Sequence, residues 1–107
     1  MQSFFYLLRV YIMPQTNIPV AKKLAKNLGV TVKASENPCK KLDVFNEKGK
    51  KIQTIGSRMH EDYLQNNDAK RRASYKKRME RHRHKLGSAS YYADKILWAS
   101  DSQMKAI

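Results

Sequence analysis

The sequence predicts an α+β fold built as one small domain. Three patterns carry this prediction: an amphipathic helical period near the N-terminus, two strand-like runs joined by a short turn, and a basic helical stretch followed by an aromatic one. With 107 residues the core must be thin, because short chains bury a smaller share of their surface. We expect an apolar segment at 1–13, the domain at 14–100 and a frayed tail at 101–107.

The first helix of the domain is expected over 18–28. Asn17 can cap it, and Pro19 suits its first turn, where a missing N–H costs little. Its apolar residues recur at four-residue intervals and form one face. Gly29 offers the left-handed conformation that commonly ends a helix. Alternating apolar and polar residues over 30–35 then predict a short strand.

Two strands are expected at 42–45 and 51–55, joined as a β-hairpin. Gly49 supplies the positive φ that such a turn needs near its end. A hairpin alone is marginally stable, so we expect it to pack on a helix or to pair with a third strand, for which 30–32 is the candidate. Gly56 is expected to end the hairpin.

A short helix at 59–64 is expected before the longest one, which should run over 68–86. Asp68 suits the start of this helix and Gly87 its end. Between Lys70 and Lys85 lie nine Lys or Arg residues and one Glu. One narrow, partly apolar face recurs at spacings of three and four: Arg72, Tyr75, Met79, His82 and Leu86.

The last helix is expected over 89–99, capped by Ser88, and it carries the densest aromatic patch of the chain. Such a patch can close the small core against the hairpin, or it can anchor the chain in a groove of a partner, where Trp and Tyr often dominate binding. One patch can serve both purposes in so small a chain. The anchor candidates are Tyr91, Tyr92 and Trp98.

An apolar run extends from Phe4 to Met13, interrupted by Arg9. It is shorter than the roughly 20 residues that a membrane-spanning helix needs. No Lys or Arg precedes it and no small-residue cleavage site follows, so it fits a signal peptide poorly. We interpret it as a buried strand or as a short helix inserted into a partner. Membrane contact through residues 4–13 stays open, without a transmembrane span.

The net charge is +13, from 22 Lys and Arg against 9 Asp and Glu. Such a chain either binds something anionic or is completed by its neighbours in an assembly. The basic helix can neutralise phosphates, or it can meet acidic protein surfaces. The residues expected to bind a partner or nucleic acid are Lys70, Arg71, Arg72, Tyr75, Lys76, Lys77, Arg78, Arg81, Arg83 and Lys85.

No motif supports catalysis or metal binding. Cys39 is the single cysteine, so neither an intramolecular disulfide nor a cysteine cluster can form. Adjacent Glu61 and Asp62 would point apart, and His82 and His84 lie on different helix faces. A glycine-rich phosphate loop is missing from the sequence. We therefore expect no enzymatic activity, no cofactor, no metal and no small-molecule substrate.

Short motifs follow one another in order through the central and C-terminal part of the chain. They are Lys40-Lys41-Leu42-Asp43-Val44, Glu47-Lys48-Gly49-Lys50, Ile55-Gly56, Asp62-Tyr63, Asp68, Arg71-Arg72, Tyr75, Arg78, Tyr91-Tyr92 and Leu97-Trp98. Over residues 40–98 this order resembles a family of small basic proteins encoded by large double-stranded DNA viruses of the chlorella-virus and mimivirus type. Met79 stands where a His is common in that family. The resemblance implies association with the virion.

These observations favour a structural component of a large DNA virus particle. The hypothesis is a minor capsid protein of the cement type, at the inner face of the capsid, which links capsid proteins through basic and aromatic surfaces and is assembled in the host cytoplasm or nucleus. The alternative is a nucleic-acid-binding protein that condenses or packages the viral genome. A ribosomal-type or RNA-binding protein shares the charge but not the order of motifs.

Overall fold

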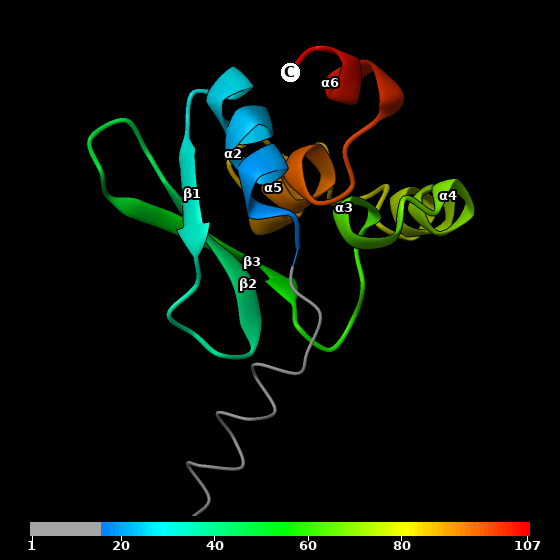
Figure 1. Cartoon of the computed structure of the whole chain (residues 1–107), viewed down its shortest axis with the longest axis horizontal. Helices are drawn as coiled ribbons and strands as arrows, with labels where there is room; N and C mark the ends of the chain where they lie inside the picture. The colour runs from blue at the N-terminus through cyan, green and yellow to red at the C-terminus, as the bar shows by residue number, and fades with distance from the viewer. Residues whose placement is uncertain (1–15) are drawn as a thin grey trace, which may run out of the picture.

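A computed structural model describes residues 16–107, and these residues have the α+β fold that the sequence predicts (Figure 1). The expected apolar segment 1–13 lies outside the described residues. In chain order the elements are α2 (Ile18–Asn27), β1 (Thr31–Ala34), β2 (Lys40–Phe45), β3 (Lys51–Ser57), α3 (Tyr63–Asn66), α4 (Ala69–Arg78), α5 (Ala89–Ile96) and α6 (Asp101–Lys105).

The three strands form one antiparallel sheet in the order β1-β2-β3, so the candidate third strand is confirmed. Val32 lies opposite Val44, and Leu42 lies opposite Ile55. Helices α2 and α5 lie against each other and cover one face of the sheet, with α2 on β1 and α5 on β3 (Figure 1). This face carries the core, because these four strand side chains are at most 2% exposed.

Strand β2 is buried on both faces. Leu42 and Val44 point toward the helices, while Lys41 and Asp43, which alternate with them, are only 4% and 3% exposed. Asp43 accepts hydrogen bonds from the hydroxyl of Ser35 (2.7 Å) and from Thr54 (3.0 Å). Burial opposes its ionisation, but these hydrogen bonds and the nearby ammonium of Lys51 hold the pKa of Asp43 below its ordinary value.

Gly56 does not end the hairpin as expected. It lies inside β3 with φ +81°, and a Cβ built on it would stand 2.8 Å from Cδ1 of Leu97 and 3.1 Å from Cβ of Lys41. The glycine therefore lets the end of α5 approach the sheet closely.

The basic helix is shorter than the expected 68–86. Helix α4 ends at Arg78, and residues 79–88 form consecutive turns. Past Arg78 a straight helix would carry almost no apolar side chain to pack, and packing is what stabilises most helices in proteins. His82 and Leu86 are consequently exposed rather than part of one helical face, Leu86 at 80%.

The short helix expected at 59–64 begins four residues later in the structure, as α3. Helix α3 begins only at Tyr63, because the side chain of Asp62 accepts a hydrogen bond from the Gln65 N–H while the side chain of Gln65 accepts one from the Asp62 N–H. This reciprocal capping box sets the start of the helix.

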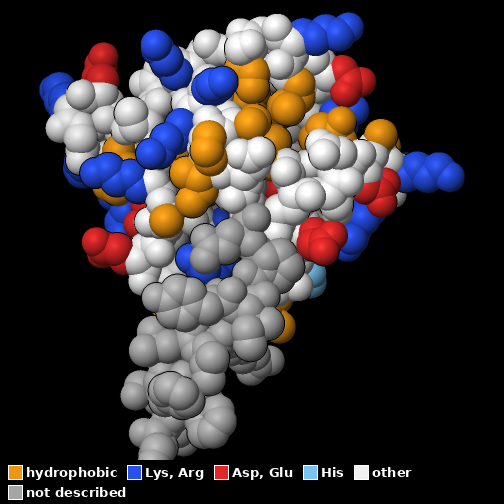
Figure 2. Space-filling view, in the orientation of Figure 1, with side chains coloured by type: hydrophobic (Ala, Val, Ile, Leu, Met, Phe, Trp, Pro, Cys, Tyr) orange, Lys and Arg blue, Asp and Glu red, His pale blue; other side chains and the backbone are white. Residues whose placement is uncertain are grey.

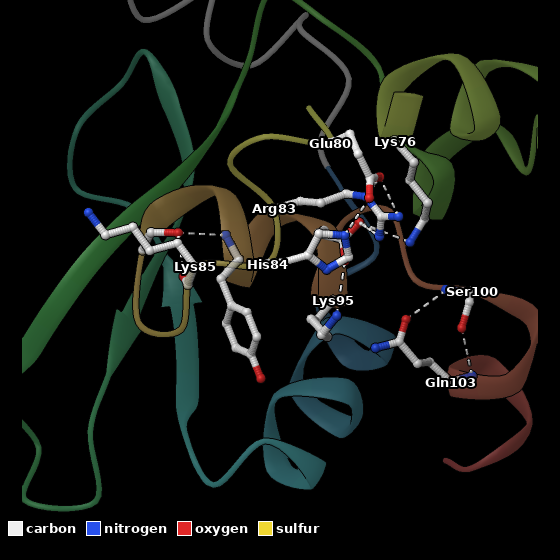
Figure 3. Close-up of polar contacts among 11 residues, drawn as sticks. Lys76, Glu80, Arg83, His84, Lys85, Lys95, Ser100 and Gln103 are labelled. Atoms are coloured by element: carbon white, nitrogen blue, oxygen red, sulfur yellow. Dashed lines mark hydrogen bonds and ion pairs between the residues drawn. The ribbon is translucent and has the colours of Figure 1, made fainter. Parts of the chain in front are cut away.

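The C-terminal predictions also need correction. Helix α5 ends at Ile96 rather than at 99, since the N–H groups of Leu97 and Trp98 both donate to the carbonyl of Ala93. Where a frayed tail was expected, Asp101–Lys105 form helix α6, which begins with a capping box between Ser100 and Gln103 (Figure 3). No helix within residues 16–107 is long and apolar enough to cross a membrane.

Candidate partner-binding cleft

A cleft opens between α4 and the loop that joins β3 to α3. Helix α4 contributes Arg71, Tyr75 and Arg78, the loop contributes His60, and the segment after α5 contributes Trp98. The outer part has a volume of about 360 Å³. An inner part of about 230 Å³ continues to the end of the β2–β3 hairpin. The cleft is therefore assembled from the start of β2, the end of β3 with the loop that follows it, helix α4 and the segment after α5.

An aromatic pair forms one wall of the cleft. The rings of Tyr75 and Trp98 stack with their centroids 4.3 Å apart and their planes inclined by 8°. The guanidinium of Arg78 lies 5.7 Å from the centroid of the Tyr75 ring. Burial and the negative charge of Asp94 raise the pKa of Tyr75, although Arg78 opposes this effect.

The side chains at the mouth of the cleft carry an excess of positive charge. Arg71 and Arg78 are exposed on the same face of α4, and Lys40 lines the inner part. Glu61 is the exposed carboxylate at this position, with its Oε2 3.8 Å from Nη1 of Arg71. A surface contact of this length contributes little energy, so Arg71 stays available to an incoming anion.

A buried ion pair lies beneath the cleft. The ammonium of Lys41 is 2.8 Å from Oδ2 of Asp62, and the two side chains are 3% and 2% exposed. The same ammonium donates to the carbonyl of His60 (2.6 Å) and to the side-chain oxygen of Gln65. Asp62 also accepts a hydrogen bond from the hydroxyl of Thr16 (3.1 Å). This network holds the His60 loop against β2, so it positions one wall of the cleft.

A second buried carboxylate joins α4 and α5. Asp94, whose side chain is 1% exposed, accepts contacts from Lys76 (3.0 Å), Arg83 (3.4 Å) and Lys95 (3.1 Å). In Figure 3 the side chains of Lys76 and Arg83 converge above α5, which carries Lys95. Burial would raise the pKa of Asp94, but the hydrogen bonds and charges of Lys76 and Lys95 hold it below its ordinary value.

Three charged side chains of the turns after α4 form a cluster around Glu80. Glu80 lies 2.7 Å from Nη2 of Arg83 and 2.8 Å from Nε2 of His84 (Figure 3). The hydrogen bonds from His84 and Arg83 lower the pKa of Glu80. Because Arg83 also reaches Asp94, these contacts fold residues 79–85 back over α5 instead of continuing α4.

Arg72 ties α4 to the C-terminal segment. It donates to the carbonyl of Ala99 (2.9 Å) and to Asp101 (3.1 Å), and its guanidinium lies 4.1 Å from the centroid of the Tyr63 ring. Its side chain is 13% exposed. This arginine therefore stabilises the fold and is largely withdrawn from any partner.

The predicted cationic residues thus divide into two groups. Arg72, Lys76 and Arg83 are bound inside the fold. The second group is exposed and has no acidic partner within residues 16–107: Lys70, Lys77, Arg78, Arg81 and Lys85. Arg71 lies between the groups, with its single long contact to Glu61.

The three predicted aromatic anchors do not form one patch. Tyr92 is 8% exposed and belongs to the core. Tyr91 is half-buried, meets Tyr92 edge-on at 5.4 Å and lies under the ammonium of Lys95. Trp98 turns instead to Tyr75 and lines the cleft. Only Trp98 therefore combines with the predicted cations.

Sequence reasoning missed the residues that position the cleft, namely Lys41, Asp62 and Asp94. Asp94 is the single acid of α5 and gave a signal, because Tyr91, Leu97 and Trp98 lie three or four residues from it and a charge on such an apolar face must find partners. Asp62 and Lys41 gave no such signal, since they lie 21 residues apart and each has a charged neighbour in the sequence. Within residues 16–107, no three His, Cys, Asp or Glu side chains are grouped as a metal ion requires.

Comparison with known families gives one partial match. A model described as a family of unknown function (DUF5754) matches residues 30–79. The match extends from β1 to the end of α4, so it includes Lys41, Asp62 and Tyr75 but neither Asp94 nor Trp98. No curated protein and no solved structure matches the chain.

Proposed function

We propose that this chain is a structural component of a large DNA virus particle, a cement-type minor capsid protein that links capsid proteins at the inner face of the shell. The proposal joins the viral resemblance over residues 40–98 to one structural observation. Exposed cations without acidic partners within 16–107 occur at well-separated places on the domain. In this role the chain acts by binding, not by catalysis.

The distribution of these cations is the observation that carries the proposal. Lys22, Lys23 and Lys26 lie on α2, Lys48 and Lys50 lie in the β2–β3 turn, and a further group lies on and after α4. The β2–β3 turn and α4 occupy opposite ends of the domain in Figure 1, with α2 between them. Figure 2 shows blue side chains at both ends and along the top of this face. A domain with positive charge at several separate places on its surface can contact several acidic neighbours at once.

The buried ion pairs support the same proposal. Asp62 and Asp94 pair with Lys41 and Lys76 within the fold, so the remaining positive charge is presented by a domain with its own core. A cement protein needs such a domain, because its surface groups must reach fixed neighbours. Condensation of nucleic acid does not need a folded domain, because a flexible basic tail can also neutralise phosphates.

Crosslinking mass spectrometry on washed, purified particles tests this function. The expected result is crosslinks from lysines of α2 and of the β2–β3 turn to capsid proteins, in constant amounts per particle. A chain that is abundant in infected cells but removed from particles by washing would overturn the proposal.

A second candidate function is condensation or packaging of the genome. It is favoured by the exposed group Lys70, Lys77, Arg78 and Arg81, which gives one side of the domain a dense positive charge. Helix α4 spans only about 15 Å, however, which limits the number of phosphates that it can follow. If the chain binds DNA through these cations, the logarithm of the affinity should fall with the logarithm of the salt concentration, with a slope of about −0.9 for each phosphate contacted. In particles, crosslinks mainly to DNA would favour this candidate over the first.

A further inference from the structure

We infer that the cleft between α4 and the His60 loop binds a short, extended acidic segment of a neighbouring protein, whose carboxylates meet Arg71 and Arg78 while its backbone and apolar groups lie against Trp98. This inference deepens the proposed linking function by naming the kind of segment that the chain holds. It rests on the arrangement of charge and aromatic surface in the cleft.

The two arginines are suited to carboxylates. Arg71 and Arg78 lie seven residues apart on one face of α4, which separates them by about 10 Å along the helix axis. Guanidinium groups bind carboxylates through two parallel hydrogen bonds. Neither arginine has a close acidic partner within the described chain, apart from the 3.8 Å contact of Arg71 with Glu61. The cleft therefore offers two binding positions for negative charge.

The spacing selects an extended ligand. In a polyproline II conformation, side chains three residues apart point to the same side and are about 9 Å apart. Two acidic residues at this interval match the separation of the arginines, and the rest of the segment can lie on an aromatic surface, as in other grooves that recognise extended peptides. Trp98, which is held in place by its stacking on Tyr75, supplies that surface.

The same geometry fits nucleic acid less well. Trp98 and Arg78 both lie over the ring of Tyr75, which leaves less of this ring for a nucleobase to stack on. Glu61 also lines the cleft, and its carboxylate repels a phosphate backbone that passes along it. A segment with only two carboxylates can avoid Glu61, whereas a strand with a phosphate on every nucleotide cannot.

Trp98 is the only tryptophan of the chain, so its fluorescence reports directly on the cleft. The test titrates the full chain with an end-blocked peptide of two Glu-Pro-Pro repeats, which carries two carboxylates three residues apart, and follows Trp98 emission. The expected result is a saturable change in emission. Arg71→Gln or Arg78→Gln should each weaken binding about tenfold, or about 1.4 kcal/mol. The paired substitution Lys48→Gln and Lys50→Gln, at the far end of the domain, should weaken it less than twofold.

Circular dichroism and the urea midpoint show whether the Arg71 and Arg78 variants stay folded, which is expected because both side chains are exposed. Three results would overturn the inference. The first is no saturable change in emission, and the second is a loss of peptide affinity in the Lys48 and Lys50 double variant as large as in the arginine variants. The third is arginine-dependent binding of oligothymidylate that is tighter than binding of the peptide. These results are distinct from failure of the linking function. Particles can show crosslinks to capsid proteins while the cleft binds no acidic peptide, and the cleft can bind the peptide in a chain that particles lack.

Discussion

Lys41 and Asp62 form an ion pair of 2.8 Å in which both side chains are almost completely buried. Lys41 belongs to β2, and Asp62 caps α3, so the pair joins the sheet to the segment that leads into α4. Moving two charges out of water costs free energy, and the attraction between them offsets this cost only when they are held in a defined geometry. In this protein Lys41 also donates to the carbonyl of His60, so the pair holds His60 and with it one wall of the cleft in place.

Replacing Lys41 by Met should destabilise the fold by about 3 kcal/mol, because the charge of Asp62 is then buried without its main partner. Urea unfolding followed by circular dichroism measures the loss. The additional substitution Asp62→Asn should restore part of the stability, since it removes the unpaired charge.

Lys40→Met is the matched control for this prediction. Lys40 is the neighbouring residue of β2, is half-buried and has no acidic partner within residues 16–107, so its loss should change the free energy of unfolding by less than about 0.5 kcal/mol. Equal losses for the two lysines would contradict a specific role of the buried pair.

Gly56→Ala should destabilise the fold by about 2–4 kcal/mol. The alanine Cβ would stand 2.8 Å from Cδ1 of Leu97, and the residue would also have to keep a φ of +81°. Gly49→Ala separates these two effects, because Gly49 has a similar φ of +80° but open space around it. The Gly49 variant should lose only about 1 kcal/mol in urea unfolding. Equal losses would show that the contact with Leu97 is unimportant.

Local sequence patterns correctly predicted the helix starts that are fixed by residues close in the sequence. Asn17 accepts a hydrogen bond from the Val20 N–H at the start of α2, and Ser88 accepts one from the Tyr91 N–H at the start of α5. The turn residue Gly49 likewise predicted the hairpin of β2 and β3, and the alternation over 30–35 predicted the strand that pairs with it.

The patterns failed where contacts distant in the sequence decide the outcome. Helical spacing placed His82 and Leu86 on one face with Tyr75, but α4 ends at Arg78, and Arg83 contacts Asp94 of α5 instead of continuing that helix. The cleft was missed for the same reason. Trp98 stacks on Tyr75 and Lys41 holds the loop that carries His60, and no local pattern encodes either of these contacts between its walls.

The stacked rings of Tyr75 and Trp98 should be energetically coupled. A double-mutant cycle of Tyr75→Leu and Trp98→Leu should give a coupling energy of about 0.5–1.5 kcal/mol, since each ring loses its partner when the other is replaced. Circular dichroism must follow the unfolding, because Trp98→Leu removes the only tryptophan. A second cycle between Trp98 and Phe45, which lies five residues along β2 from cleft residue Lys40, should show additive losses. Additivity in the first cycle would exclude an energetic role of the stack.

The lowered pKa of Asp94 predicts a loss of stability in acid. A carboxyl group whose pKa is lower in the folded state binds protons more weakly there than in the unfolded chain. Its contribution is therefore fully present above its unfolded pKa of about 3.9 and is lost as the pH falls toward the lowered folded value. The contribution of Asp94 to the free energy of unfolding should be nearly constant between about pH 7 and pH 5, and it should fall below about pH 4.

Asp94→Asn should reduce stability at neutral pH by about 2–3 kcal/mol, because Lys76, Arg83 and Lys95 then converge without their shared carboxylate. The same substitution should flatten the acid decline, since one of the groups that must be protonated is gone. Asp43 has a lowered pKa as well, so part of the decline should persist. Glu47→Gln, in the exposed β2–β3 turn, serves as the control and should leave the pH profile unchanged. A decline in Asp94→Asn as steep as in the wild type would show that Asp94 is not among the groups responsible.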